Sequence, residues 1–195
     1  MTKAILPQAV KVGGSFYKIH TDFKYFIRLC QLLKDKQTPI NALDFIYAGE
    51  IPPNRAEGIR AVCEFMQPPL ILPRRTGDEP TETVLDYELD ADLIFSAFLE
   101  NYGIDLVDTP LHWYKFQALL RGLHDTELNR VIGHRLWTNT TGRNDSYTKQ
   151  QQKLYEAWRL PQKEDGENDE ALKAFEAQLK GQYGRRRSSN RHKSQ

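Results

Sequence analysis

The stretch LHWYKFQALLRGL, residues 111–123, constrains the fold more than any other part of the chain. At about 100° per residue, its large apolar side chains gather on one side of a helix. These side chains are Trp113, Phe116, Leu119, Leu120 and Leu123. The opposite side holds mainly Tyr114, Lys115, Gln117 and Arg121. The spacing predicts an amphipathic helix with Trp113 and Phe116 in a protein core, so base stacking is not the first interpretation of these rings.

Helical spacing recurs along the rest of the chain. It predicts helices at about 21–35, 38–47, 54–66, 90–102, 126–137 and 146–160, besides the one at 111–123. The first of these has an apolar stripe made of Phe23, Phe26, Ile27, Cys30 and Leu33. In the helix at 90–102, residues 93–99 are apolar nearly all round, which predicts a central place in a bundle.

Residues that favour helix ends mark several of these boundaries. Thr21 or Asp22 can cap the first helix, and Asn54 can cap the third. Thr38 and Thr109 each precede a proline, the usual order of a cap followed by the first helical position. We therefore expect the helices at 38–47 and 111–123 to begin directly after these threonines.

A short hairpin precedes the helices. Gly13 and Gly14 suit the positive φ angles of a two-residue turn between strands. This turn would place Val10 opposite Tyr17 and Val12 opposite Ser15. Because an isolated hairpin is marginal, its apolar face should pack on the helices.

The predicted fold is mainly α: a helical bundle with a small N-terminal β-hairpin. The hairpin and first helices occupy residues 1–69, and a linker rich in Pro, Gly and charge occupies 70–84. A second helical part follows at 85–160, and 161–195 is a charged, largely disordered tail. The apolar stretches fall short of the roughly 20 residues of a membrane span, and no secretory signal is visible, so we expect a cytoplasmic protein.

Motifs for catalysis or for binding a cofactor or metal are missing from the sequence. The alternating acids Asp86, Glu88, Asp90 and Asp92 lack the glycine and the final glutamate of a calcium loop, and are better explained as the acidic start of a helix. His112 lies near an apolar face, where a structural role is usual. Cys30 and Cys63 are expected to be buried free thiols. We therefore expect no enzyme activity, cofactor or metal.

Charge is unevenly distributed along the chain. Residues 76–110 hold ten acids and no Lys or Arg, whereas residues 181–195 hold five bases and no acid. The basic end could contact phosphate, but no aromatic residue follows Tyr183 to add stacking. A solvated tail is the simpler interpretation, and a nucleic-acid partner is not favoured.

Two segments carry a resemblance to a known family. DYELDADLIFSAFLENYGIDL, followed closely by LHWYKFQALLRGL, resembles the phage gp-fifteen family of Gram-positive siphophages and prophages, and the helix VIGHRLW that comes after them also fits. Tyr114 stands where members commonly have the second tryptophan of a pair. The resemblance covers about residues 5–160 and is strongest at 85–137.

The resemblance implies a role in building the phage tail. Proteins of this kind are thought to be tail assembly chaperones, which keep the tape measure protein soluble as homo-oligomers or in many copies and are absent from the mature virion. The alternatives are a structural virion component at a tail or connector joint and, third, a nucleic-acid-binding accessory protein. If the polar side of helix 111–123 meets the client, Tyr114, Lys115 and Arg121 are the expected contacts.

Overall fold

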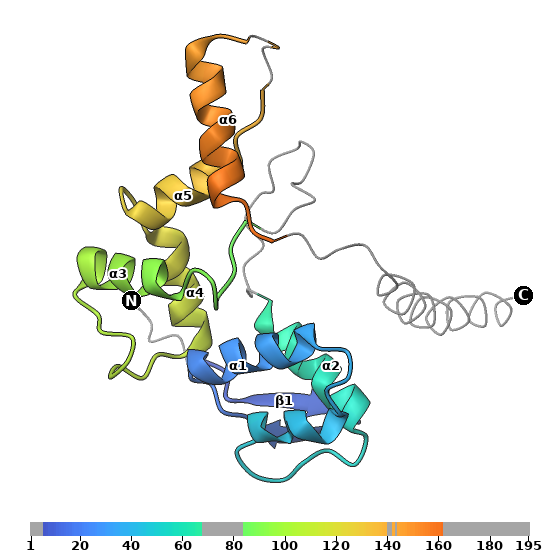
Figure 1. Cartoon of the computed structure of the whole chain (residues 1–195). Coiled ribbons are helices and arrows are strands. Elements are labelled where there is room, and N and C mark those ends of the chain that lie inside the picture. Colours follow the sequence, from blue (N-terminus) through green and yellow to red (C-terminus); the bar gives the residue numbers. More distant parts are fainter. Residues whose placement is uncertain (1–5, 68–83, 140–141, 143, 162–195) are drawn as a thin grey trace, which may run out of the picture. The chain divides into compact units, whose positions relative to one another are not determined.

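The computed structural model describes residues 6–67, 84–139, 142 and 144–161 of the chain. Their fold is mainly α with a small N-terminal hairpin, as predicted, and the described residues as far as Leu160 belong to one compact unit (Figure 1). The predicted linker at 70–84 falls almost wholly outside the described residues, as does the tail beyond residue 161.

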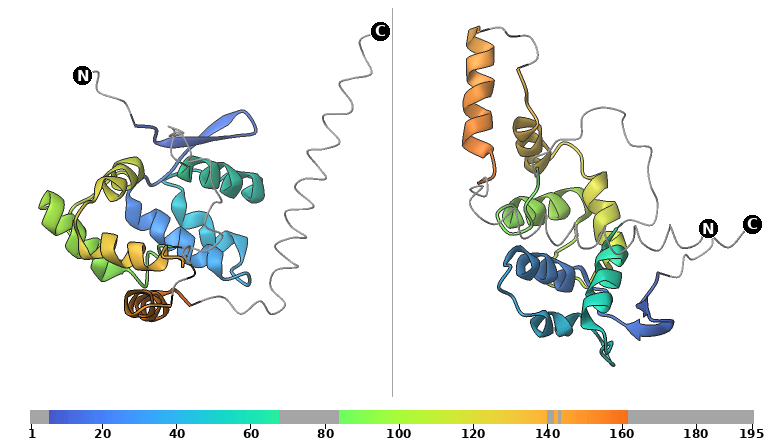
Figure 2. Two further views of the ribbon diagram at one scale, coloured as in Figure 1. Left: turned by 90° about the horizontal axis from the view of Figure 1, so that it is seen from above. Right: turned by 90° about the vertical axis from the view of Figure 1, so that its right-hand side faces the viewer.

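The hairpin pairs β1 (Ala9–Val12) with β2 (Ser15–Lys18) in the expected register, with Val10 opposite Tyr17. Gly13 and Gly14 take positive φ angles of 56° and 92° in the turn, a conformation that only glycine adopts without strain. Val10 and Val12 are buried. The hairpin lies beside α2 (Arg55–Met66), as both views of Figure 2 show, so the helices cover its apolar face.

Helix α1 (Phe23–Lys34) begins after Asp22, whose carboxylate accepts the Lys24 N–H at 3.0 Å. Phe23 and Phe26 are buried as predicted. The prediction for Leu33 is wrong, because this side chain is 42% exposed and Leu29 takes the buried position instead. The buried stripe of α1 is therefore rotated toward Leu29 relative to the stripe predicted from the sequence.

Residues Ile40–Ile46 form a short 3₁₀ helix, η1, rather than the α-helix expected at 38–47. Pro39 occupies the cap position without a side-chain hydrogen bond, and the Thr38 hydroxyl donates to Asp35 at 3.4 Å. The predicted threonine cap is therefore wrong. Asn54 does cap α2, since its side-chain oxygen accepts the Glu57 N–H at 3.2 Å.

Helix α3 (Ala91–Tyr102) ends at Gly103, whose φ of 64° is the left-handed conformation common at helix ends. Ile94, Ala97 and Phe98 are buried. Leu99 is 48% exposed, so the predicted burial on all sides of this helix is wrong. The helix lies at the edge of the core with one face open.

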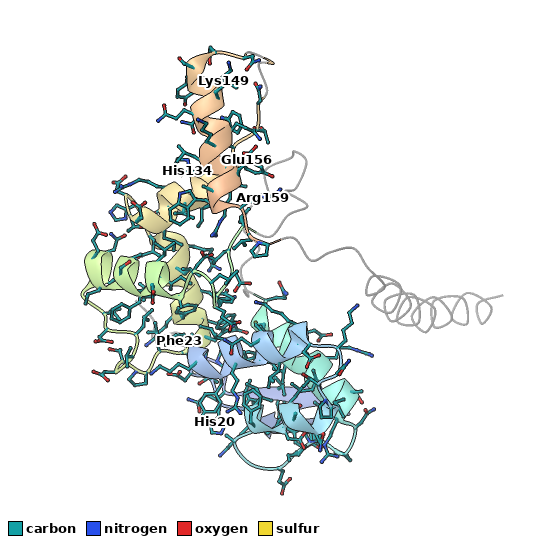
Figure 3. All side chains as sticks on the ribbon, in the orientation of Figure 1. His20, Phe23, His134, Lys149, Glu156 and Arg159 are labelled. Atoms are coloured by element: carbon teal, nitrogen blue, oxygen red, sulfur yellow. The ribbon has the colours of Figure 1, made fainter. Side chains whose placement is uncertain are left out.

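Three helices follow: α4 (Trp113–Gly122), α5 (Glu127–Arg135) and α6 (Ser146–Trp158). Thr126 and Asn129 form a reciprocal capping box that starts α5. Helix α6 lies against α5 and has no buried residue (Figure 1). Its Lys149 and Glu156 are exposed along the helix (Figure 3).

One core joins residues from both sides of the undescribed stretch 68–83. Its largest side chains with almost no exposed surface are Trp113, Phe26, Phe98 and Phe116. The Phe26 ring stacks on the Trp113 ring with centroids 5.0 Å apart, and Phe116 lies 5.3 Å from Phe98. The burial of Trp113 and Phe116 confirms that these rings are core.

Candidate functional surface

Helix α4 is held at its start by a junction with the segment that opens α1. The Trp113 N–H donates to the Thr21 carbonyl at 2.7 Å, and the Phe23 N–H donates to the Leu111 carbonyl at 2.9 Å. Asp22 joins the same junction, because its second carboxylate oxygen accepts the Leu111 N–H at 2.9 Å. Figure 3 marks Phe23 at this place. These bonds keep residues 111–112 extended.

The helix accordingly begins at Trp113, and the predicted start at Thr109 and Pro110 is wrong. His112 is the actual cap: its Nδ1 accepts the Tyr114 N–H at 3.1 Å. Its Nε2 lies 3.0 Å from the Pro7 carbonyl, so the tautomer that satisfies both contacts carries the proton on Nε2. The expected structural role of His112 is confirmed.

The inner side of α4 also completes the end of α2. The Trp113 indole N–H and the Gln117 side-chain amide both donate to the Met66 carbonyl at 3.0 Å. Carbonyls in the last turn of a helix lack partners within the helix, so these donors satisfy one of them. The Phe116 ring stacks on Phe23 with centroids 4.5 Å apart. Helix α4 is therefore firmly anchored on one side.

Tyr114 lies at the edge between the buried and exposed sides of α4. Its ring stacks on Phe65 of α2 at a centroid distance of 4.8 Å and meets the His112 ring edge-on at 5.3 Å. Burial raises the pKa of the Tyr114 hydroxyl, which is therefore neutral at physiological pH. The phenol is thus fixed in place while part of its surface remains open to a partner.

Lys115 and Arg121 are exposed on the outer side of α4. Arg121 lies seven residues after Tyr114 and so shares its side of the helix, whereas Lys115 points about 100° away. Arg121 also acts on the phenol of Tyr87, whose pKa is raised by burial and lowered to a smaller extent by this positive charge. The three predicted contacts thus form an outer face of α4, defined as Tyr114, Lys115 and Arg121, rather than a converging pocket.

The structure contains a buried ion pair between Asp90 and Arg135 that the sequence analysis did not predict. The Arg135 guanidinium donates to both carboxylate oxygens of Asp90 at 2.7 Å, and the two side chains are 6% and 2% exposed. Arg135 also donates to the carbonyls of Val84 at 3.0 Å and Trp158 at 2.7 Å. One guanidinium therefore ties the start of α3 to the ends of α5 and α6.

Helical spacing carried a signal for this pair. Asp90 lies four residues before the buried Ile94, and Arg135 lies four after the buried Val131, so each falls on the apolar side of its helix. Asp90 is one of four alternating acids at 86–92, and the sequence does not distinguish the buried member of this run from the others. In the structure Asp86 pairs with Lys34 at 2.6 Å, whereas Glu88 and Asp92 are exposed.

The part of the chain that the structure describes was also searched for metal sites, membrane-spanning helices and reactive thiols. No group of three or more His, Cys, Asp or Glu side chains within it could hold a metal ion. None of its helices has the length and apolar character of a membrane span. Cys30 and Cys63 are half-buried free thiols, and burial raises the pKa of each.

The comparisons with known proteins point to one family. No curated protein and no solved structure matches the chain. The family described as Bacteriophage Gp15 protein matches residues 3–160, which include the hairpin, the junction, the outer face of α4 and the pair of Asp90 with Arg135. The chain therefore belongs to the bacteriophage Gp15 protein family.

Proposed function

We propose that this phage protein is a tail assembly chaperone that binds the tape measure protein and keeps it soluble in the host cytoplasm. It would act in several copies on the client and be absent from the finished virion. The Gp15 family is not a known enzyme family, which agrees with a binding role.

The outer face of α4 is the observation that carries the proposal. Tyrosine and arginine are enriched among the residues that dominate protein interfaces, and a side chain already fixed in place loses little entropy on binding. Tyr114 meets this condition, since Phe65 and His112 hold its ring from two sides. Lys115 and Arg121 would add charge at the rim of the contact, where it guides association more than it adds affinity.

Co-expression with the tape measure protein of the same phage tests the proposal. We expect the client to become soluble only with this chain, in a complex whose mass by light scattering corresponds to many copies. The double variant Tyr114→Ala, Lys115→Glu should reduce the recovered complex at least about tenfold, the effect of roughly 1.4 kcal/mol. Lys149→Glu, an exposed change on α6, is the matched control and should leave recovery unchanged.

A client that stays insoluble with the unchanged chain would refute the chaperone proposal. If the double variant and the control reduce the recovered complex equally, the assignment of the client interface to α4 is refuted, while the chaperone proposal itself is not. Mass spectrometry of purified particles separates the alternative of a structural virion component, which requires this chain at a fixed copy number in the particle. A chaperone should be missing there.

A further inference from the structure

The hairpin has an outer face that points away from the helices. Side chains alternate between the two faces of a sheet, so the buried Val10 and Val12 put Lys11 on the outer side. Phe16 lies directly opposite Lys11, and Lys18 follows on the same side two residues later. Both lysines are exposed, and the Phe16 ring, at 74%, is the most exposed large apolar side chain among the described residues. These three side chains, Lys11, Phe16 and Lys18, are the basic face of the hairpin.

The charge of this face is not neutralised by the rest of the described structure. Neither Lys11 nor Lys18 forms a salt bridge with another described residue, whereas Lys34 and Arg55 each pair with an aspartate. An aromatic side chain with charged groups at its rim is the usual arrangement of a protein interface. The basic face therefore has the chemistry to bind a surface that is both apolar and acidic.

Helix α3 presents a surface of this chemistry. The turn before the helix continues the same spiral, since the Asp90 N–H donates to the Asp86 carbonyl at 2.9 Å. The exposed residues of turn and helix therefore fall on one side. This acidic face of α3 consists of Glu88, Leu89, Asp92, Ser96, Leu99 and Glu100.

The acidic face carries unpaired negative charge and open apolar surface together. Its three acids make no ion pair within the described ranges, whereas Asp86 and Asp90 are paired with lysine and arginine. Two large apolar side chains lie among the acids, Leu89 at 60% and Leu99 at 48% exposed. The acidic face is thus opposite to the basic face in charge and similar to it in apolar character.

The spacing of the charges on the two faces also agrees. The two lysines of the hairpin are diagonal neighbours across the strand pair, so their backbones lie about 7–8 Å apart. Glu88 and Asp92 are separated by about one helical turn, or roughly 6 Å along the axis. The exposed Leu89 lies between them in the sequence and on the same side. The Phe16 ring can therefore meet Leu89 while the two lysines meet the two acids.

We propose that the basic face of the hairpin of one copy docks on the acidic face of α3 of a second copy. Both faces belong to one compact unit and make no salt bridge with each other within its described residues, so a second copy supplies the partner. Because the two faces differ, the contact is heterologous, and copies add head to tail into rings or filaments. The charged groups are exposed, which makes each contact weak and sensitive to salt.

Light scattering on the full-length chain, without a client, tests the contact. At 50 mM salt the weight-average mass should rise above the 22.6 kDa of one chain as the protein concentration increases. At 0.5 M salt the association constant should fall at least about tenfold, because the Debye length is then well below the roughly 10 Å of 0.1 M salt. A mass of one chain at every concentration at 50 mM salt would overturn this proposal and leave the chaperone proposal standing.

Two charge-reversed variants identify the faces that meet. The hairpin variant carries Lys11→Glu with Lys18→Glu. The helix variant carries Glu88→Lys with Asp92→Lys. Each variant alone should associate at least tenfold more weakly than the wild type, because like charges then face each other. An equimolar mixture should regain association, because the reversed faces fit each other and so do the unchanged ones. Wild-type association by either variant alone, or a mixture that stays monomeric, would overturn the proposal.

Matched controls lie on α6, outside both faces. Lys149→Glu with Lys153→Glu also reverses two exposed lysines and should leave association unchanged. All these positions are exposed, so every variant should keep the fold, which urea unfolding checks.

A variant without a change of charge tests the apolar part of the contact. Phe16→Ser should weaken association at least threefold at 50 mM salt, because the ring between the two lysines is lost. Tyr147→Ser removes a ring that is 65% exposed on α6 and should have no effect. Equal losses for the two serine variants would overturn the proposal.

Discussion

Replacing Asp90 with alanine tests the physical account of the buried pair most directly. The substitution removes the acceptor of two hydrogen bonds from Arg135, each 2.7 Å long, and of one from the Asp86 N–H at 2.9 Å. The guanidinium stays buried with its charge uncompensated, while the carbonyls of Val84 and Trp158 remain its only partners among the described residues.

The expected cost follows from this environment. Breaking a buried pair by removing one partner costs about 3–5 kcal/mol, because the other charge cannot regain water. Domains of this size unfold with about 5–15 kcal/mol, so Asp90→Ala should remove about a fifth of the stability or more. The free energy of unfolding in urea, followed by circular dichroism on the full chain, measures the change.

An exposed ion pair serves as a matched control, because it shows how much charge pairing contributes to stability without burial. Arg130 and Glu127 form an equally short pair of 2.7 Å, but their side chains are 67% and 50% exposed. Glu127→Gln should therefore cost less than about 1 kcal/mol. The paired change Asp90→Leu with Arg135→Met should be much milder than Asp90→Ala, since no lone charge remains. An Asp90→Ala cost equal to that of the control would refute the reasoning.

Four further predictions concern buried or half-buried groups. The Tyr47 hydroxyl is buried and has no hydrogen-bond partner among the described residues, so Tyr47→Phe should leave stability unchanged or raise it by up to about 1 kcal/mol in urea unfolding. Burial raises the pKa of Tyr47 to about 12 from its usual value near 10, so wild-type stability should fall between pH 10 and 12, where only the unfolded state ionises, and Tyr47→Phe should lack this slope. A Cβ at position 58 would meet the Tyr47 hydroxyl, so Gly58→Ala should lower the melting temperature and Tyr47→Phe should restore part of the loss; additive effects would contradict the contact. Because burial raises the pKa of Cys30 and Cys63, both thiols should react at least tenfold more slowly with Ellman's reagent in the native protein than in urea at pH 8, and equal rates would contradict their burial.

Periodicity predicted the helices well where burial on one side decides the structure. Phe23, Phe26, Trp113 and Phe116 lie in the core as their spacing indicates. Residues that favour helix starts predicted the helix boundaries less reliably. A threonine followed by proline is an equally good start at 38 and at 109, but the junction with Thr21 and Phe23 holds residues 111–112 extended. Such a tertiary bond is not visible in the sequence around residue 109.

The candidate surface shows the same limit. The sequence placed Tyr114, Lys115 and Arg121 on the polar side of one helix, and the structure adds the ring of Phe65 that fixes Tyr114. That contact joins residues on either side of the stretch 68–83, so no local pattern could predict it. Whether the outer face of α4 meets a client stays a prediction.

The bonds to the Met66 carbonyl have a consequence for synthesis on the ribosome. The Trp113 donor lies 47 residues further along the chain. At roughly 5–20 residues per second, about 2–9 seconds pass between the emergence of the acceptor and that of its donor. During this interval Phe26 and Phe65 have no Trp113 or Tyr114 ring to cover them, and the nascent chain carries an open aromatic surface. Folding of the hairpin, α1 and α2 is therefore completed only when the second half of the chain has been made.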